Sequence, residues 1–362
     1  MKTALKGWFF RIALALVGGL VGLAMIEGIL CLYIYIADVD LPSKPPRWVE
    51  SGGIQSFDEE LGWVLKPDFE SEGVRTNSLG FRSSSEYDLN NDEAQRVMIL
   101  GDSMVFGSGE EQENIFTEVL NRQSDSRLFI NAGVRGYSTW QEYLVLSKYI
   151  EKIRPQVVVL FYTQSNDLLS NVRESDFYPS VSLEQGRLVG KKASEFRNLP
   201  MYKKTFIYRF LSKYYLRGRD LSYFWNRSDL QLRQGDSYVW LVAVEILKDF
   251  ASLRDQYSFE LYVVDIPTLS QLKWGTGGEY RQDLLSKLCR SLNIPYFDLR
   301  DHYPSDSSVL FLENDSHYNV TGHQFIADFL ESVVLRESDT RSEPTPSSSF
   351  RSPAPPPVSL NR

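Results

Sequence analysis

Four short apolar runs set the strongest limit on what this chain can fold into. They are VMIL at 97–100, LFIN at 128–131, VVVLFY at 157–162 and LYVVDI at 261–266. Each is rich in β-branched or aromatic residues and lacks polar alternation, which indicates a strand buried on both faces. The segments between them, NIFTEVLNRQ, STWQEYLVLSKYIEKI and YVWLVAVEILKDFASLRDQY, repeat their apolar residues at helical spacing.

This alternation of strands and helices predicts an α/β fold. Strands that alternate with helices form a parallel sheet covered by helices on both sides. We therefore expect three layers, α/β/α, around a central, mostly parallel sheet. Ligands bind such sheets at the carboxyl ends of the strands, so residues that directly follow the predicted strands are the first candidates for a functional site.

Reactive and turn-forming residues do follow the predicted strands. They are Ser103, Gly133, Gly136, Asn166 and, in the late segment ENDSHYNVTGH, Asp315, His317 and His323. Taken singly, a glycine or asparagine at a strand end is most often a turn former. Because loops from four separate places are expected at one edge of the sheet, the set as a whole indicates a site.

The residue types in this set are those of serine nucleophilic catalysis. A serine that attacks an ester needs a base to take its proton, a group that orients the base, and donors for the oxyanion. Ser103, His317 and Asp315 can fill the first three roles. The alternative interpretation is that Ser103 only ends a strand and that His317 is structural. Few histidines and no carboxylate cluster at ligand spacing favour a mechanism without metal or cofactor.

The composition excludes some other classes of protein. The chain has 362 residues, of which 43% are hydrophobic and 13% aromatic, enough for a sizeable packed core. A net charge of -8 and the lack of a long basic run argue against nucleic-acid binding. The two cysteines, Cys31 and Cys289, lie in unrelated segments, so neither a disulfide nor a cysteine metal site is expected.

The N-terminal region predicts a membrane anchor. Residues 12–37 are apolar apart from Glu27 and exceed the roughly 20 residues that a membrane-spanning helix needs. The segment is preceded by Lys2, Lys6 and Arg11 and followed by Asp38 and Asp40. This charge bias places residues 1–11 in the cytoplasm and the rest of the chain outside the membrane.

Two further patterns bear on assembly and source. Gly18 and Gly22 form a GxxxG pair that would allow a homodimer through the membrane helix, although glycine is frequent in membrane helices in any case. Asn314-Asp-Ser and Asn319-Val-Thr both match the glycosylation acceptor pattern and flank His317. A glycan there would obstruct the site, which favours a bacterial inner-membrane protein whose domain faces the periplasm.

The remaining organisation follows from composition. We expect a juxtamembrane connector at 38–91, one catalytic domain at 92–337 and a disordered tail at 338–362, which is rich in proline and serine. Within the domain, residues 170–234 form an insertion rich in aromatic and basic residues. This insertion is equally consistent with a lid or substrate platform and with an amphipathic helix whose basic face is solvated.

Four blocks of the chain together resemble the SGNH, or GDSL-type, hydrolases. The blocks are GDS at 101–103, NAGVRGYST at 131–139, SND at 165–167 and DSHYNVTGH at 315–323. The lead-in, FDEELGWVLKPD followed by TNSLGFRS, is similar to that of bacterial membrane-anchored members. The resemblance implies a flavodoxin-like five-stranded sheet and catalysis without a cofactor.

The same resemblance assigns roles to individual residues. Ser103 would be the nucleophile and His317 the base, and the oxyanion hole would consist of the Ser103 and Gly136 N–H groups and the Asn166 side chain. The chain departs from the family pattern at Asn314, where an aspartate is usual, so that Asp315 is the candidate acid. It departs again at Gln164, where glycine is usual.

These features predict a membrane-anchored serine esterase that removes or transfers small acyl groups, such as acetyl, on an envelope glycan or glycolipid. The substrate would thus be an acylated carbohydrate or lipid. One alternative is a lipase or lysophospholipase of the same type. Another is a catalytically idle relative that binds glycan or lipid, which the displaced acid and Gln164 would suit.

Overall fold

A computed structural model defines the fold over most of the central part of the chain. It describes residues 8, 11, 14–15, 17–19, 21–29, 53–71, 73–172, 178–193, 238–267, 272, 279–313 and 315–336. The predicted tail at 338–362 and most of the insertion at 170–234, including its aromatic and basic run, lie outside the described residues. So do Cys31 and Asn314.

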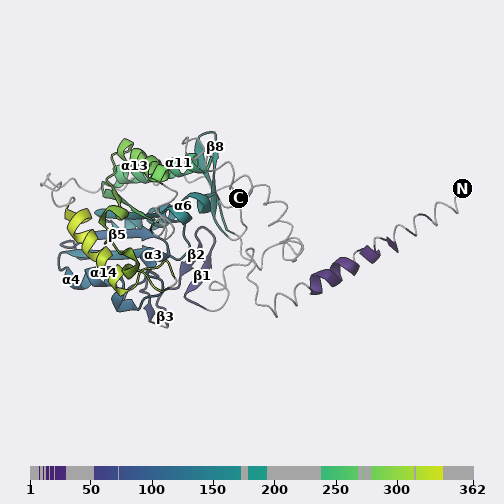
Figure 1. The fold of residues 1–362 in the computed structure, drawn as a ribbon, viewed down its shortest axis with the longest axis horizontal. Helices are drawn as coiled ribbons and strands as arrows, with labels where there is room; N and C mark the ends of the chain where they lie inside the picture. The colour runs from purple at the N-terminus through teal and green to yellow at the C-terminus, as the bar shows by residue number, and fades with distance from the viewer. Residues whose placement is uncertain are drawn as a thin grey trace.

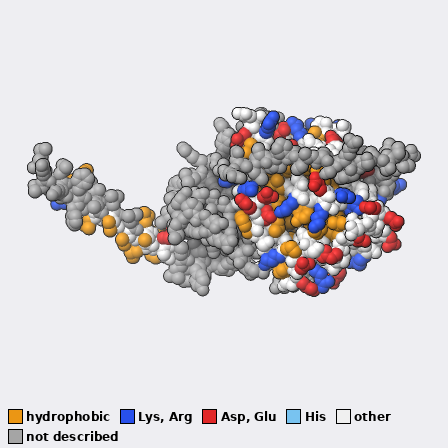
Figure 2. Space-filling view, turned by 180° about the vertical axis from the view of Figure 1, so that it is seen from behind, with side chains coloured by type: hydrophobic (Ala, Val, Ile, Leu, Met, Phe, Trp, Pro, Cys, Tyr) orange, Lys and Arg blue, Asp and Glu red, His pale blue; other side chains and the backbone are white. Residues whose placement is uncertain are grey.

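The predicted membrane segment is described only in part. Within 12–37 the described residues are 14–15, 17–19 and 21–29, and all of them are helical. Their large apolar side chains are exposed, and Figure 2 shows them in orange along this helix. In the part of the chain that the structure describes, no helix is long and apolar enough to span a membrane. Homodimerisation through Gly18 and Gly22 stays a prediction.

The central sheet has five strands, as expected. In spatial order they are β11 (Tyr296–Asp298), β10 (Glu260–Ile266), β7 (Val157–Thr163), β5 (Gln95–Gly101) and β6 (Arg127–Gly133). Every neighbouring pair is parallel. The four apolar runs of the sequence are β5, β6, β7 and β10. The predicted α/β fold with a five-stranded parallel sheet is therefore confirmed.

Helices cover both faces of this sheet (Figure 1). Alternate residues of a strand face opposite sides, and β5 sends Met98 and Leu100 into one core cluster and Val97 and Ile99 into the other. The first cluster is completed by α5 (Thr139–Ile153), α11 (Tyr238–Tyr257) and α13 (Glu279–Ser291). The second is completed by α4 (Phe116–Gln123) and α14 (Val320–Phe329). Burial on both faces explains why the strands read as unbroken apolar runs.

Shorter elements lie at the loops and ends. Among them are α3 (Ser103–Phe106), α6 (Gln164–Asn171), the 3₁₀ turns η1 (Gln112–Asn114), η4 (Leu299–His302) and η5 (Ser307–Leu310), and the π-helical turn η6 (Leu330–Val334). Two-residue strands β3 (Glu70–Ser71) and β4 (Val74–Arg75) form a small antiparallel pair. Both α3 and α6 begin where a central strand ends, so these two helices belong to the edge at which a site is expected.

The packed domain begins earlier than the sequence indicated. Strands β1 (Gln55–Asp58) and β2 (Gly62–Leu65) form an antiparallel hairpin. This hairpin and the residues after it contribute side chains to the same core cluster as α5 and α11, namely Ile54, Leu61, Trp63, Leu65 and Phe81. Side chains of the segment 53–91, expected to belong to a connector, therefore form part of the core of the domain. The sequence indicated a connector there because the stretch contains proline and serine residues, whereas the five side chains named above are buried in the domain.

The described part of the insertion forms a second hairpin. Strands β8 (Ser180–Glu184) and β9 (Arg187–Lys191) pair antiparallel around Gln185 and Gly186, which both have positive φ. Two such residues in sequence form the turn that matches the twist of a two-residue hairpin. The chain just after β9 is joined to the turn between β1 and β2, since the Ala193 N–H donates to the Glu59 carbonyl at 3.0 Å. Neither the lid nor the amphipathic-helix interpretation of the aromatic run is tested by these residues.

Candidate active site

The candidate nucleophile sits on a tight turn between β5 and α3. Asp102 directly follows the strand and caps the helix that begins at Ser103, because its side chain accepts a hydrogen bond from the Met104 N–H at 2.9 Å. Gly107, at φ 82°, ends this helix after one turn. A Cβ on Gly133 would lie 2.4 Å from the Phe106 nitrogen, so only glycine lets β6 approach α3 this closely. Ser103 remains partly exposed at the carboxyl edge of the sheet.

The structure brings the three expected catalytic residues into one chain of contacts. The Ser103 Oγ lies 2.8 Å from His317 Nε2. On the other side of the ring, His317 Nδ1 lies 2.7 Å from Asp315 Oδ1. These are hydrogen-bonding distances, and their order is nucleophile, base, acid. Residues 103 and 317 meet only because the fold joins β5 to the segment before α14.

Asp315 reaches the ring because its loop curls back on itself. The Leu312 N–H donates to the His317 carbonyl at 2.9 Å, and the Asp315 N–H donates to the Leu312 carbonyl at 3.2 Å. The His317 N–H in turn donates to Asp315 Oδ1 at 3.1 Å. An acid two residues before the histidine can therefore contact the imidazole, although the spacing is short.

The electrostatics of Asp315 suit an acid that stays ionised. Partial burial tends to raise its pKa, but the hydrogen bonds from the His317 ring and N–H, with the charge of that ring, outweigh burial and hold the pKa below its ordinary value. The carboxylate is 48% exposed and the His317 side chain 25% exposed. A negative charge beside Nδ1 stabilises the imidazolium that would form when Nε2 takes a proton.

The expected oxyanion donors are set by the register of the sheet. Gly101 pairs with Gly133, and the Val134 N–H donates to the Gly101 carbonyl at 3.1 Å, so the loop that carries Gly136 leaves the sheet beside the nucleophile turn. Gly136 is exposed, and its N–H finds no acceptor among the described residues. Asn166 lies in the first turn of α6, directly after β7. Its side chain is outside the description.

An arginine from the segment 53–91 holds the loop behind the nucleophile. Arg82 is fully buried and donates to the carbonyls of Phe106 at 3.0 Å, Gly107 at 2.6 Å and Glu110 at 2.6 Å. Its guanidinium also lies 4.8 Å over the Phe106 ring. Burial, followed by the charge of Arg135, lowers the pKa of Arg82 to about 10, so it is still a cation at neutral pH. Arg82 belongs to the block TNSLGFRS, but nothing in that block indicated which groups the arginine binds.

Two buried acids lie on the helices that follow the strands β6 and β7. Glu142 belongs to α5 and Asp167 to α6, and both are fully buried. Burial raises the pKa of Glu142 well above its ordinary value, and Asp167 raises it further. Burial and then Asp102 raise the pKa of Asp167 in the same way. Both shifts favour the protonated, uncharged form of these two carboxyl groups. Sequence reasoning missed both residues because nothing in their spacing marks them.

His323, the other histidine of the late segment, has a structural place. It lies on α14, accepts a hydrogen bond from the Phe116 N–H at 3.3 Å and stacks on the Phe116 ring. Burial lowers its pKa to about 3, with smaller contributions from Arg82 and His317. It is therefore neutral, and it lies outside the chain of contacts that joins Ser103, His317 and Asp315. Over the described residues, no group of three or more histidine, cysteine or acidic side chains is placed to hold a metal ion.

Comparison with known proteins gives structural neighbours only. No protein-family model and no curated protein sequence matches the chain. Among solved structures, it is similar to a psychrotrophic esterase from Pseudoalteromonas, with 14% identity, a TM-score of 0.39, and coverage of 68% of this chain and 99% of that one. A lipase/acylhydrolase from Enterococcus faecalis matches with 14% identity, a TM-score of 0.38, and coverage of 70% and 100%.

A third neighbour is described as a member of the lipolytic G-D-S-L family, from Veillonella parvula. It has 14% identity and a TM-score of 0.39, and the match covers 67% of this chain and 100% of that one. Identities of this size leave the activity to be argued from the residues of the site.

Proposed function

We propose that the chain is a serine esterase of the SGNH type, a hydrolase or acyltransferase acting on ester bonds. The observation that carries this proposal is the contact chain Ser103 Oγ, His317 Nε2, His317 Nδ1, Asp315 Oδ1, with distances of 2.8 and 2.7 Å. Nucleophile, base and acid in this order are the arrangement of a catalytic triad, which is recognised by geometry and roles rather than by sequence order.

The geometry supports a two-step acyl transfer. His317 Nε2 accepts the Ser103 hydroxyl proton while Oγ attacks the ester carbonyl carbon, and the N–H groups of Ser103 and Gly136 with the Asn166 amide receive the oxyanion. The imidazolium then gives its proton to the leaving alkoxide, and an acyl-Ser103 ester remains. Water, or an acceptor hydroxyl, reverses these steps with His317 as base.

The membrane anchor belongs to this proposal. The described residues of 8–29 are helical, and their apolar side chains are exposed, which is unfavourable in water. Insertion of the segment 12–37 into a bacterial inner membrane would remove this surface from water and would hold the domain on the periplasmic side. Membrane fractionation of the full chain against a chain that starts at residue 53 tests this part.

The substrate we propose is a small acyl ester, such as O-acetyl, on an envelope glycan or glycolipid. An anchored domain acts on substrates within reach of the membrane, and envelope glycans and glycolipids both lie within that reach. The second candidate, a lipase or lysophospholipase, rests on the same anchor. A series of esters of increasing acyl length separates the two, because a lipase retains or gains kcat/KM with longer chains and an acetylesterase loses it.

Replacement of the nucleophile tests the catalytic proposal. We expect Ser103→Ala to abolish hydrolysis of a short-chain aryl acetate, since loss of a triad serine can cost about 10⁶-fold in kcat. A fluorophosphonate probe should label the parent chain at Ser103 and leave the variant unlabelled. Full activity of Ser103→Ala, or a parent chain that resists the probe, would contradict the proposal and favour the binding-only alternative. An unchanged Tm shows that the variant is folded.

A further inference from the structure

The peptide group that carries the Gly136 N–H is bonded at its other end to Trp63. The indole Nε1–H of Trp63 donates to the Arg135 carbonyl at 3.0 Å. That carbonyl and the Gly136 N–H are the two polar ends of one planar peptide unit. Because the unit is rigid, a bond that fixes the carbonyl also fixes the direction in which the N–H points.

This peptide needs an external restraint. Gly136 has a φ of 77°, and glycine passes easily between such conformations because it has no Cβ. Gly136 is exposed, and its N–H has no acceptor among the described residues. Without a partner on the Arg135 carbonyl, rotation of the peptide would turn the N–H away from the oxyanion position at little cost.

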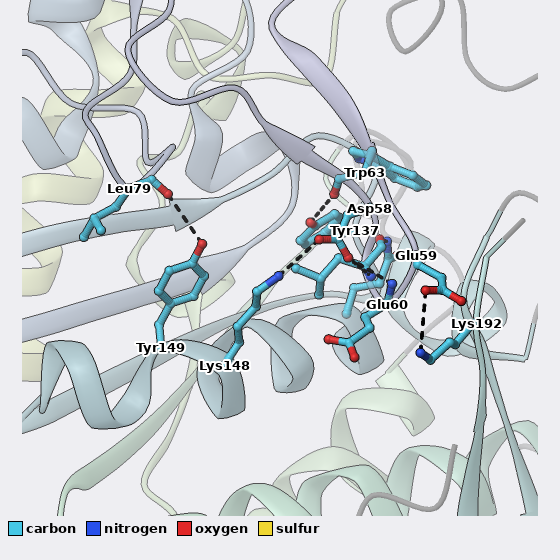
Figure 3. Close-up of polar contacts among 11 residues, drawn as sticks. Asp58, Glu59, Glu60, Trp63, Leu79, Tyr137, Lys148, Tyr149 and Lys192 are labelled. Carbon is cyan, nitrogen blue, oxygen red and sulfur yellow. Dashed lines mark hydrogen bonds and ion pairs between the residues drawn. The ribbon is translucent and has the colours of Figure 1, made fainter. Parts of the chain in front are cut away.

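The β1–β2 hairpin is hydrogen-bonded to the loop at 135–137 on both sides of Gly136. The Tyr137 hydroxyl donates to the Trp63 carbonyl, as Figure 3 shows, so Trp63 is bonded to the residue before and the residue after the glycine. Further along the chain, the Gln141 amide donates to the Leu61 carbonyl at 2.7 Å. The Trp63 and Tyr137 rings pack with centroids 5.6 Å apart. Trp63 itself is 1% exposed, so water does not compete for these bonds.

We propose that Trp63 is a positioning residue for the oxyanion hole. It holds the Arg135–Gly136 peptide so that the N–H faces the reacting carbonyl, and by donating to the carbonyl end it polarises the N–H into a stronger donor. Preorganised donors of this kind stabilise the charge that develops in the transition state. The inference rests on the proposed esterase activity, and it extends the functional site to a segment that precedes the sheet.

Trp63→Phe removes the indole N–H while most of the ring remains. Loss of a whole oxyanion donor costs about 10²–10³-fold in kcat. A donor that is present but no longer held should cost less, so we expect kcat on an aryl acetate to fall by about tenfold with little change in KM, because the bond acts on the transition state. Fluorophosphonate labelling at Ser103 should persist, though more slowly.

The matched control is Lys148→Met. Lys148 binds Asp58 at 3.1 Å and ties the same hairpin to α5 without touching the loop at 135–137 (Figure 3). We expect this variant to keep the parental kcat. A parental kcat in Trp63→Phe would overturn the proposal. So would a loss of kcat in Lys148→Met equal to that in Trp63→Phe, because docking of the hairpin alone would then explain the effect.

A second measurement separates an oxyanion defect from general damage to the fold. A thionoester develops its charge on sulfur, which benefits less from N–H donors placed for oxygen. The ester-to-thionoester ratio of kcat/KM should therefore be smaller in Trp63→Phe and Tyr137→Phe than in the parent. An unchanged ratio in both variants contradicts the inference. Ser103→Ala distinguishes the two proposals, since its full activity would overturn the esterase itself, whereas a negative Trp63 result would leave the esterase intact.

Discussion

The two ends of the contact chain Ser103–His317–Asp315 are held in different ways. At the nucleophile end, the loop after Ser103 is fixed by Arg82, a fully buried side chain that comes from 21 positions earlier in the chain. At the acid end, Asp315 is placed by hydrogen bonds within residues 312–317, and its side chain is 48% exposed. The nucleophile is thus positioned by tertiary contacts, and the acid by a local turn.

This difference predicts two kinds of mutational effect. A change at the acid end should alter the chemistry and leave the free energy of unfolding almost unchanged, since little is buried there. A change at the nucleophile end should alter both, because the same bonds hold the loop and stabilise the core. Comparing kcat with Tm for each variant tests the distinction.

The largest of these effects is expected at Asp315. Asp315→Asn should lower kcat by up to about 10⁴-fold, as for other triad aspartates, because an amide cannot stabilise the imidazolium as a carboxylate does. Its Tm should stay close to that of the parent. Asn314→Ala, one residue away, is the control and should change kcat far less. Near-parental turnover of Asp315→Asn would mean that another group stands behind His317.

Arg82→Lys should show the mixed behaviour of the nucleophile end. Lysine keeps the charge but loses the planar fork, so some of the three carbonyls are left unsatisfied. We expect a loss of about 3 kcal/mol in the free energy of unfolding together with a fall in kcat of about tenfold through misplacement of the Ser103 turn. Arg75→Lys, at an exposed ion pair with Glu70 in the same segment, should change neither. A stable but inactive Arg82→Lys would weaken the comparison.

The smallest effect concerns stability at the buried acid beneath the site. Neither carboxyl oxygen of Glu142 has a hydrogen-bond partner among the described residues, and burial raises its pKa. The unfolded chain releases this proton above about pH 4.3, whereas the folded chain keeps it, so the parent loses stability as pH rises from there toward the folded pKa.

Glu142→Gln removes this titration at nearly constant shape. The Tm of Glu142→Gln minus the Tm of the parent should therefore increase as the pH rises from 5 to 8, and this difference should be largest at pH 8. Glu113→Gln, at an exposed position, should give a constant gap. Parallel Tm curves for the parent and Glu142→Gln would show that Glu142 ionises at its ordinary pH in the folded chain.

Local patterns in the sequence were sufficient to predict the sheet and to name the residues that the structure brings together at the candidate site. A strand that is buried on both faces must be apolar throughout, and such a run can be recognised within a few consecutive residues. This is why the sequence predicted β5, β6, β7 and β10. Side-chain type and short sequence blocks at strand ends were enough to name Ser103, His317 and Asp315.

Only the tertiary structure decided what holds those groups in place. The segment 53–91 is polar enough to resemble a connector, yet Trp63 and Arg82 bind backbone carbonyls that lie 72 and up to 28 positions away. Every residue offers such a carbonyl, so no residue type marks the partner in advance. The curl that turns Asp315 toward His317 is likewise made of backbone hydrogen bonds, and their directions exist only once the chain is folded.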